Sequence, residues 1–468
     1  MKKYLTQIAQ INALLILLIL CAPAYAQKQT PPPGGKPKDF KLPEKKQGQL
    51  PNGLKTTMVQ FGAVPKVTVQ VIIKTGNVHE GPEQVWLADL TGDLLKEGGT
   101  TTMDFKTISK KVAGMGGDIF VNVGLDQTYI SGSVLSEFTP DLIKIIADMV
   151  INPKFPESEI ARLKDDLKRT LSVQKEIPQS KAQEKFMGTI YAGQSYGRYF
   201  PTEKMIDSYT VDMVKGFYDA NFGAKRTVVY VAGKFDEAVA TKAIEDAFKG
   251  FKTGPEVSYP QVNQVKTNQV SIIDRPNAPQ TTVIIGLPTL TPKNPDVVAL
   301  QVTNAILGGS FSSRITTNLR EDKGFTYSPS STIRNDKGVS IWYEQADVTS
   351  ANTGESLQEI AKEINKLQKE APSETELNGI KNYMAGIFVL QNSSPGGIIG
   401  QLNFLDLHEL DDSYLTNRVN NILAVTPDQV SKMAKEHFKY EDMTVVLVGD
   451  KKLLNKQMKA HEDAKKLK

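Results

Sequence analysis

Several stretches of the chain alternate apolar and polar residues or repeat apolar residues at helical spacing. Residues 67–72 read Val-Thr-Val-Gln-Val-Ile, and this period of two predicts a β-strand with one face in the core. Residues 139–151 place their apolar residues on one helical face, which predicts an amphipathic helix. Continuous apolar runs at 227–233 and 444–449 predict buried strands. The chain therefore combines strands with amphipathic helices.

These elements recur in the second half of the chain at a nearly constant distance. Pro279 and the strand that follows it come 214 residues after Pro65 and its strand. A helix that begins at Thr426 follows a helix that begins at Thr210 by 216 residues, and each threonine is a suitable N-cap. The two buried apolar runs are 217 residues apart. Agreement across three kinds of element indicates an internal duplication.

The duplication predicts an α+β fold with two homologous domains, each a mainly antiparallel β-sheet packed with α-helices. We expect the domains at residues 47–250 and 268–468, joined by a linker at residues 251–267 that contains Gly and Pro. The length of 468 residues agrees with this division, because one domain has roughly 100–200 residues.

The first residues have the composition of a targeting segment. Two lysines, an apolar run and an Ala-Tyr-Ala ending predict a secretory signal at residues 1–26. The apolar run is shorter than the roughly 20 residues that a membrane-spanning helix needs, and Cys21 leaves open the alternative of a lipid anchor. Residues 27–46 are rich in Pro and Lys, which predicts an extended linker. We therefore expect an exported protein, in the bacterial periplasm or on the cell surface.

Composition narrows the classes of function. With 56 basic and 52 acidic residues, the net charge of +4 is too small for a nucleic-acid-binding protein. One cysteine excludes a disulfide framework and a cysteine zinc site. No two of the four histidines lie within one helical turn of each other, so a local His-x-x-x-His pair is absent. Lysines alternate with apolar residues over 451–468, and we expect a docked terminal helix there, with no membrane association.

Ordered motifs in both halves resemble the insulinase (pitrilysin-type) zinc peptidases. In the first half they are Leu50-Pro51-Asn52-Gly53-Leu54-Lys55, Glu80, Trp86-Leu87-Ala88, Gly98-Gly99-Thr100 and Asn152-Pro153-Lys154-Phe155. In the second half they are the segments 307–314 and 319–327. Their order covers nearly the whole chain after the targeting segment. The resemblance implies this family's two-domain architecture, in which one such chain forms half of a clamshell.

The resemblance fails at the catalytic motif. Active members carry His-x-x-Glu-His, whose two histidines bind zinc and whose glutamate is the general base. The aligned residues here are Asp89, Gly92 and Asp93, and the family's third ligand, a glutamate, aligns with Arg169 or Thr170. Two carboxylates on one helical face suit Ca²⁺ or Mg²⁺, but without a third partner they make a poor site. The resemblance therefore implies no metal in this chain, and we expect a solvated, lapsed catalytic face.

The second half retains residues that the family uses in paired enzymes. In those enzymes zinc lies on one subunit, and the other subunit contributes an Arg and a Tyr, which align here with Arg320 and Tyr327. A guanidinium and a phenol can bind a peptide carbonyl and stabilise an oxyanion. The alternative from the residues alone is that Arg320 pairs with Glu321 or Asp322 at an exposed helix end and that Tyr327 begins a strand.

We expect an exported, catalytically incomplete insulinase-like subunit. It would pair with a zinc-bearing subunit and, with it, degrade peptides or unfolded polypeptides, but would not be a peptidase alone. Zinc would lie in the partner, and this chain would bind no cofactor. The second interpretation is a non-enzymatic scaffold or binding protein that keeps the fold, and the retained Arg320 and Tyr327 favour the first. The histidine count opposes a third interpretation, a stand-alone peptidase.

Overall fold

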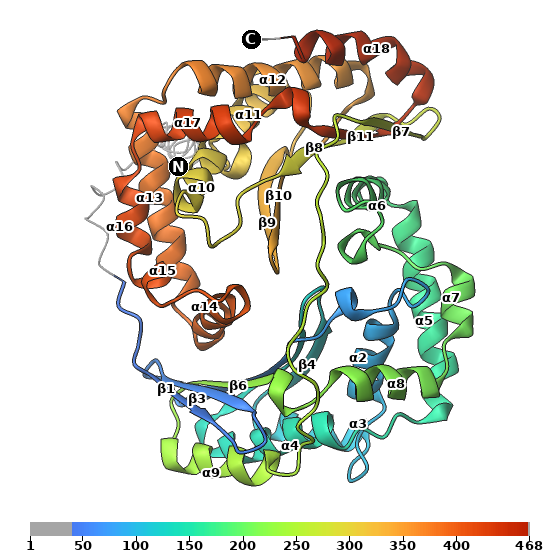
Figure 1. Cartoon of the computed structure of the whole chain (residues 1–468), viewed down its shortest axis with the longest axis vertical. Helices are drawn as coiled ribbons and strands as arrows, with labels where there is room; N and C mark the ends of the chain where they lie inside the picture. The colour runs from blue at the N-terminus through green and yellow to red at the C-terminus, as the bar shows by residue number, and fades with distance from the viewer. Residues whose placement is uncertain (1–39, 467–468) are drawn as a thin grey trace, which may run out of the picture. The chain divides into compact units, whose positions relative to one another are not determined.

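The computed structural model describes residues 40–466, which contain two β-sheets (Figure 1). The first sheet has the order β1-β2-β6-β3-β5-β4 and contains β1 (Lys45–Gln49), β2 (Lys55–Gln60), β3 (Lys66–Ile73), β4 (Asp118–Val123), β5 (Thr128–Leu135) and β6 (Thr227–Gly233). The second has the order β7-β11-β8-β10-β9 and contains β7 (Val270–Asp274), β8 (Gln280–Pro288), β9 (Ser330–Asp336), β10 (Val339–Thr349) and β11 (Thr444–Gly449). The signal sequence predicted at residues 1–26 and the first part of the linker predicted at 27–46 lie outside the described residues.

The two sheets have the same topology apart from the additional β1. In chain order, β2 to β6 of the first sheet correspond to β7 to β11 of the second. The pair β2–β6 is parallel and so is its counterpart β7–β11, while the other pairs between these strands are antiparallel. The prediction of two homologous, mainly antiparallel α+β domains is therefore confirmed.

The helices also recur in the same order. The first domain contains α2 (Leu87–Glu97), α3 (Phe105–Gly114), α4 (Thr139–Ile151), α5 (Glu157–Glu176), α6 (Pro178–Ile190), α7 (Glu203–Ser208), α8 (Val211–Asn221) and α9 (Glu237–Phe248). The second contains α10 (Val297–Asn304), α11 (Arg314–Thr316), α12 (Thr353–Lys369), α13 (Glu374–Gln391), α14 (Pro395–His408), α15 (Ser413–Thr416), α16 (Arg418–Ala424), α17 (Pro427–His437) and α18 (Lys451–Ala464). The hydroxyls of Thr210 and Thr426 accept backbone N–H groups at the starts of α8 and α17, so both predicted caps are present.

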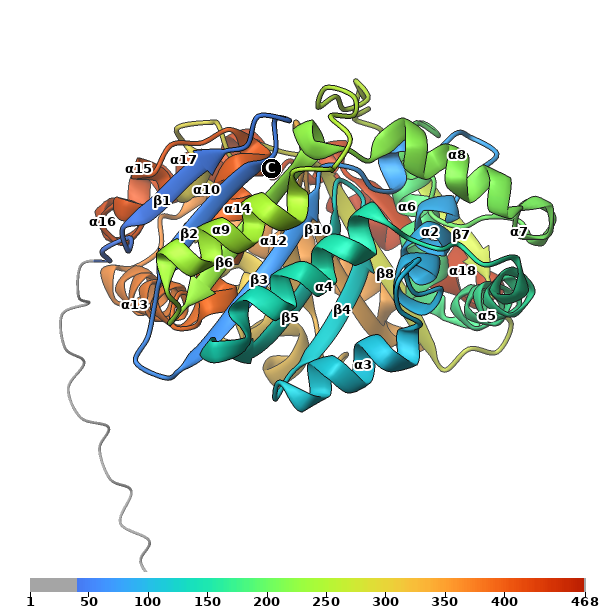
Figure 2. The same ribbon diagram turned by 90° about the horizontal axis from the view of Figure 1, so that it is seen from below.

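The central strands of each sheet are buried on both faces. In β3, Val69 and Val71 join the core of the first domain, to which α4 contributes, whereas the intervening Ile72 belongs to a separate cluster on the other face. Figure 2 shows α4 and α9 lying across the first sheet. All residues of β6 and β11 are buried, as the continuous apolar runs predict for strands covered on both sides.

Helices α6 and α14 cover the sheet of the opposite domain (Figure 1). Phe186 of α6 packs in one cluster with Val446 of the second sheet. Leu402 of α14 packs in another with Val228 of the first sheet. Because each domain supplies a helix to the other's sheet, neither sheet is fully covered by its own domain, and the two domains stabilise each other by burial of apolar surface.

The two predicted linkers lack regular structure over most of their described length but are held in place. Phe40 packs edge-on against Phe388 with a ring separation of 5.0 Å, and the linker predicted at 27–46 ends inside β1. Residues 252–269 form no helix or strand, and the buried Arg226 donates to the Glu256 carbonyl at 3.0 Å and to Ser258 Oγ at 2.8 Å. Within residues 40–466, no helix has the length and apolar character needed to cross a bilayer.

Candidate functional site

One of the positions aligned with the family's zinc motif borders a cavity of about 400 Å³ in the first domain. Asp89 of α2 and Thr170 of α5 both line it, so two residues 81 positions apart in the sequence face the same space. Val123, at the end of β4, forms part of the wall, and Trp86 precedes α2 there. Arg334 of β9 also lines the cavity, which is therefore built from both domains.

Two carboxyl groups and one carboxamide form a hydrogen-bonded cluster in this cavity, whose polar lining also includes Arg198 and Arg334. Asn77 Nδ2 donates to Asp89 Oδ2 at 2.6 Å and to Glu80 Oε1 at 3.2 Å. Glu80 also accepts the backbone N–H groups of Ala88 at 2.7 Å and Trp86 at 3.1 Å, at the start of α2. Asn77 and Glu80 therefore tie the segment between β3 and α2 to the helix itself.

Burial changes the protonation of both carboxyl groups. It raises the pKa of Glu80 to about 8, with a further contribution from the nearby Asp89 charge, while three N–H donors oppose the rise. Burial also raises the pKa of Asp89 to about 6. One of these two neighbouring carboxyls therefore keeps a proton at neutral pH. Sequence reasoning missed Asn77 and Glu80 as site residues; the signal that could have found them is the place of Glu80 among the family-like motifs.

The space beside Gly92, which the sequence resemblance aligns with the family's general base, is filled. A Cβ atom at Gly92 would lie 2.6 Å from Val123 Cγ2, closer than two carbon atoms can approach without a shift. Gly92 is buried, and Asp93 is half-buried with a pKa raised by burial and then by the charge of Glu97. The expectation of a solvated catalytic face is therefore wrong, because this face of α2 packs against β4.

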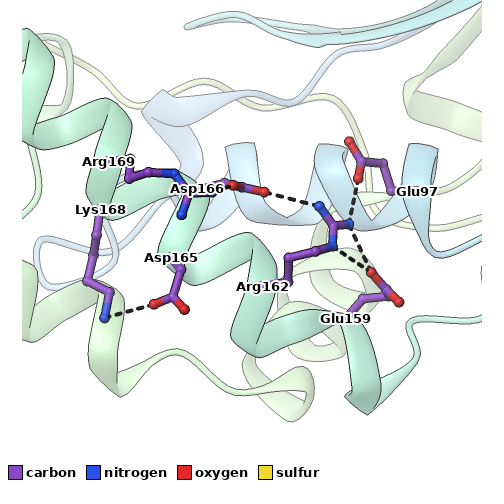
Figure 3. A network of polar contacts seen from close by, with 7 residues as sticks. All are labelled: Glu97, Glu159, Arg162, Asp165, Asp166, Lys168 and Arg169. Carbon is purple, nitrogen blue, oxygen red and sulfur yellow. Dashed lines mark hydrogen bonds and ion pairs between the residues drawn. The ribbon is translucent and has the colours of Figure 1, made fainter.

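The two candidates for the third ligand position point in different directions. Arg169 forms an ion pair with Asp166 on the exposed face of α5, close to Arg162 (Figure 3). Arg162 Nη2 in turn donates to Glu97 of α2 at 2.6 Å, which joins the two helices on their outer side. Thr170 instead borders the cavity with Asp89. Of the two candidates, Thr170 is the one that faces the space beside Asp89, and its hydroxyl is not among the usual zinc ligands.

These residues do not fit a zinc site. Zinc in proteins is held by Cys, His or carboxylate groups in a tetrahedral arrangement, and Gly92 and Thr170 offer none of them. Asp89 is already hydrogen-bonded to Asn77. Within residues 40–466 no group of three or more His, Cys, Asp or Glu side chains is placed to hold a metal ion. The geometry is consistent with a chain that has no zinc of its own.

Arg320 and Tyr327 lie elsewhere and do not border this cavity. Arg320 is on the π-helical segment Thr317–Asp322, with its Nε atom 3.2 Å from Glu321 Oε1 and its guanidinium 4.5 Å from the centre of the Phe311 ring. Tyr327 lies in the loop before β9 and is 86% exposed. Sequence reasoning missed Phe311, which is 73% exposed; an aromatic residue between serines in the segment 307–314 was its signal.

Comparison with family models and curated proteins places these observations in context. Residues 60–201 match the model described as "Insulinase (Peptidase family M16)", and residues 208–384 match "Peptidase M16 inactive domain". An uncharacterized zinc protease of Bacillus subtilis, YmxG, is 24% identical over 404 residues, which cover 85% of this chain and 96% of that protein.

Solved structures share the fold. The peptidase M16 inactive domain from Pseudomonas fluorescens has a TM-score of 0.81 at 23% identity and covers 87% of this chain and 98% of its own. The first half of the periplasmic protease PqqL from Escherichia coli has a TM-score of 0.72 at 14% identity and covers 92% and 97%. With the two family matches and the duplicated topology, the chain belongs to the insulinase (peptidase M16) family, as a member without the His-x-x-Glu-His motif.

Proposed function

We propose that the protein is an exported, zinc-free subunit of a heteromeric insulinase-family peptidase, and that Arg320 and Tyr327 serve the zinc site of its partner. One observation carries the proposal. Arg320 and Tyr327 are accessible to solvent and can donate hydrogen bonds, whereas the described residues offer no set of side chains that fits a metal ion. The exposed Phe311 beneath Arg320 also supports it, because large exposed aromatic side chains are enriched where proteins bind each other.

The two side chains suit the binding of a peptide substrate. The guanidinium of Arg320 and the hydroxyl of Tyr327 would donate hydrogen bonds to a peptide carbonyl oxygen and stabilise negative charge that develops on it. The contact between Arg320 and the Phe311 ring restricts the guanidinium, so less conformational entropy is lost when it binds. The substrates would be peptides or unfolded polypeptides, enclosed between the two subunits.

Export and pairing agree with what is known of the relatives. One structural relative is named an inactive domain and another is half of a periplasmic protease. We propose that the signal at residues 1–26 directs this chain to the same kind of compartment and that residues 47–250 and 268–468 are its domains. Sequencing of the mature N-terminus tests the signal: a chain that begins at Gln27 supports cleavage after Ala26, and a retained Met1 contradicts it.

The proposal is tested by kinetics of the reconstituted complex. The chain is co-purified with a zinc-bearing insulinase-family subunit from the same organism, and turnover of one peptide is measured. We expect Arg320→Ala and Tyr327→Phe each to lower turnover about 100- to 1000-fold, as loss of an oxyanion donor does, with the complex intact. Arg320→Lys fails almost as badly because an ammonium lacks the planar fork. Arg275→Gln, at an exposed position, is the control.

The isolated chain provides a second test. We expect no stoichiometric zinc after dialysis and no cleavage of a quenched fluorescent peptide, because Asp89 and Asp93 have no third ligand and no group of three metal-binding side chains is found within residues 40–466. About one equivalent of zinc that survives dialysis contradicts the proposal.

One observation favours the scaffold interpretation. Arg320 pairs with Glu321 of its own chain, as expected for a surface residue without a catalytic role. Unchanged turnover in both Arg320→Ala and Tyr327→Phe, with the complex intact, would identify the chain as a scaffold or binding protein.

A further inference from the structure

A second cavity lies in the second domain, at the place equivalent to the first. It has a volume of about 410 Å³. On α13, Ile387 and Gln391 line it one turn apart near the end of the helix, as Thr170 and Gln174 of α5 line the first cavity. The next helix of each domain, α14 or α6, also contributes to its cavity. The duplication has therefore produced two related cavities.

Arg418 is the only charged residue among the described residues that line the second cavity. Its side chain is half-buried, its Nη1 atom is buried without a hydrogen-bond partner, and no ion pair with a described carboxylate is found. Its guanidinium lies 5.6 Å from the centre of the Tyr414 ring. Burying a charge without an opposite charge is costly. The cavity is therefore preorganised for an anion that a ligand would supply.

Besides Tyr383 and Tyr414, the remaining polar lining consists of uncharged carboxamides. They are Gln301, Asn304, Asn335, Gln391 and Gln401. The carboxamide oxygen of Gln301 is buried without a partner. Since each carboxamide can both donate and accept hydrogen bonds, this lining suits a peptide backbone.

An apolar surface leads away from the cavity along α13. Tyr383, Ile387 and Leu390 are exposed at helical spacing, and Leu390 is 67% exposed. Tyr383 and Ile387 also line the cavity itself. A ligand with one anionic end and an apolar body would contact both Arg418 and this stripe.

We propose that the second cavity binds the C-terminal carboxylate of a peptide, with Arg418 as the counter-ion and the apolar terminal side chain against α13. A single arginine matches a single negative charge, whereas phosphate sites usually gather more than one cationic or backbone donor. The volume is within the roughly 300–1,000 Å³ of small-ligand sites. This site belongs to the isolated chain and does not depend on the proposed zinc-bearing partner.

Fluorescence polarisation tests the site on the full chain without a partner. The probe is N-terminally fluorescein-labelled Ala-Ala-Ala-Leu with a free carboxylate, compared with the same peptide ending in an amide. We expect the acid to bind at least about tenfold more tightly than the amide, since charge-assisted Arg–carboxylate bonds are roughly twice as strong as neutral ones. Arg418→Gln should reduce binding of the acid to that of the amide, and the exposed Arg275→Gln should not.

Three results would overturn this proposal. The first is equal binding of acid and amide by the wild-type chain, or binding of neither, a comparison that requires no variant to fold. The second is unchanged binding by Arg418→Gln. The third is displacement of the probe by inorganic phosphate more effectively than by 4-methylpentanoate, which would identify a phosphate site. Displacement by 4-methylpentanoate, a lone carboxylate on an apolar chain, would support the assigned chemistry.

Discussion

The two cavities occupy equivalent places in domains of the same topology, yet the charged groups that line them differ. The first contains the carboxyl groups of Glu80 and Asp89 together with Arg198 and Arg334, while the second contains Arg418 as its one charged residue among those described. The duplicated fold sets where each cavity forms, and a few side chains decide what chemistry it can perform.

The helices beside the two cavities also differ. In α2, Gly92 lets Val123 pack against a continuous helix. After α10, the segment Ala305–Gly309 widens into a π-helical turn, where a Cβ atom at Gly308 would lie 2.5 Å from Glu344 Oε2. Glu344 is fully buried, and burial raises its pKa well above the usual range. In both domains a glycine allows a side chain to approach the helical backbone closely. In the first domain this side chain is apolar, and in the second it carries a carboxyl group.

The largest predicted effect on stability comes from the protonation of Glu80, a residue of the first cavity only. Its pKa of about 8, against an ordinary 4.5, means that the folded state binds more protons between these values. Stability therefore falls as pH rises through this window. At about 1.4 kcal/mol for each pKa unit, the loss between pH 5 and pH 9 is about 3–5 kcal/mol. Urea unfolding should show that Glu80→Gln removes most of this loss.

The matched variant in the second cavity is Arg418→Gln, which should leave the pH dependence of stability unchanged. An arginine stays charged over this range. If the stability of Glu80→Gln changes with pH as strongly as that of the wild type, the first cavity does not hold a protonated carboxyl at neutral pH.

The next largest effect on stability is expected at Gly92, which packs beside the first cavity. Alanine usually stabilises an exposed helix position relative to glycine by roughly 0.5–1 kcal/mol. Gly92→Ala should instead destabilise the chain by about 1–3 kcal/mol, because its Cβ atom would meet Val123. Gly216→Ala, in α8 with no atom within 4 Å of its Cβ position, is the control and should be stabilising. Equal effects of the two substitutions in thermal unfolding would show that Val123 can move aside.

Removal of Arg418 should have the smallest effect on stability. Arg418→Gln breaks no ion pair or hydrogen bond found among the described residues and removes a charge that has no counter-ion, so the free energy of unfolding should stay the same or rise slightly. By contrast, Arg314 donates from Nε and Nη2 to the two carboxylate oxygens of Glu376, each at 2.8 Å. Arg314→Gln should therefore cost roughly 1–3 kcal/mol. A comparable loss in Arg418→Gln would mean that Arg418 has a structural partner.

The sequence by itself determined the features that depend on local pattern or residue identity. A period of two specified β3, continuous apolar residues specified β6 and β11, and the capping threonines marked the starts of α8 and α17. The recurrence of these elements revealed the duplication before any contact was known. The absence of a His-x-x-Glu-His motif likewise required only the order of residues.

Only the tertiary structure decided which of these residues meet. Arg169 and Thr170 are neighbours in the sequence, but a helix turns about 100° per residue, so the packing of α5 against α2 decides which one faces the cavity. The burial of Gly92 depends on Val123, and the covering of each sheet depends on a helix from the opposite domain. The isolation of Arg418 depends on the absence of acidic side chains from several separate helices. These properties arise from contacts between distant segments, which have no local pattern in the sequence.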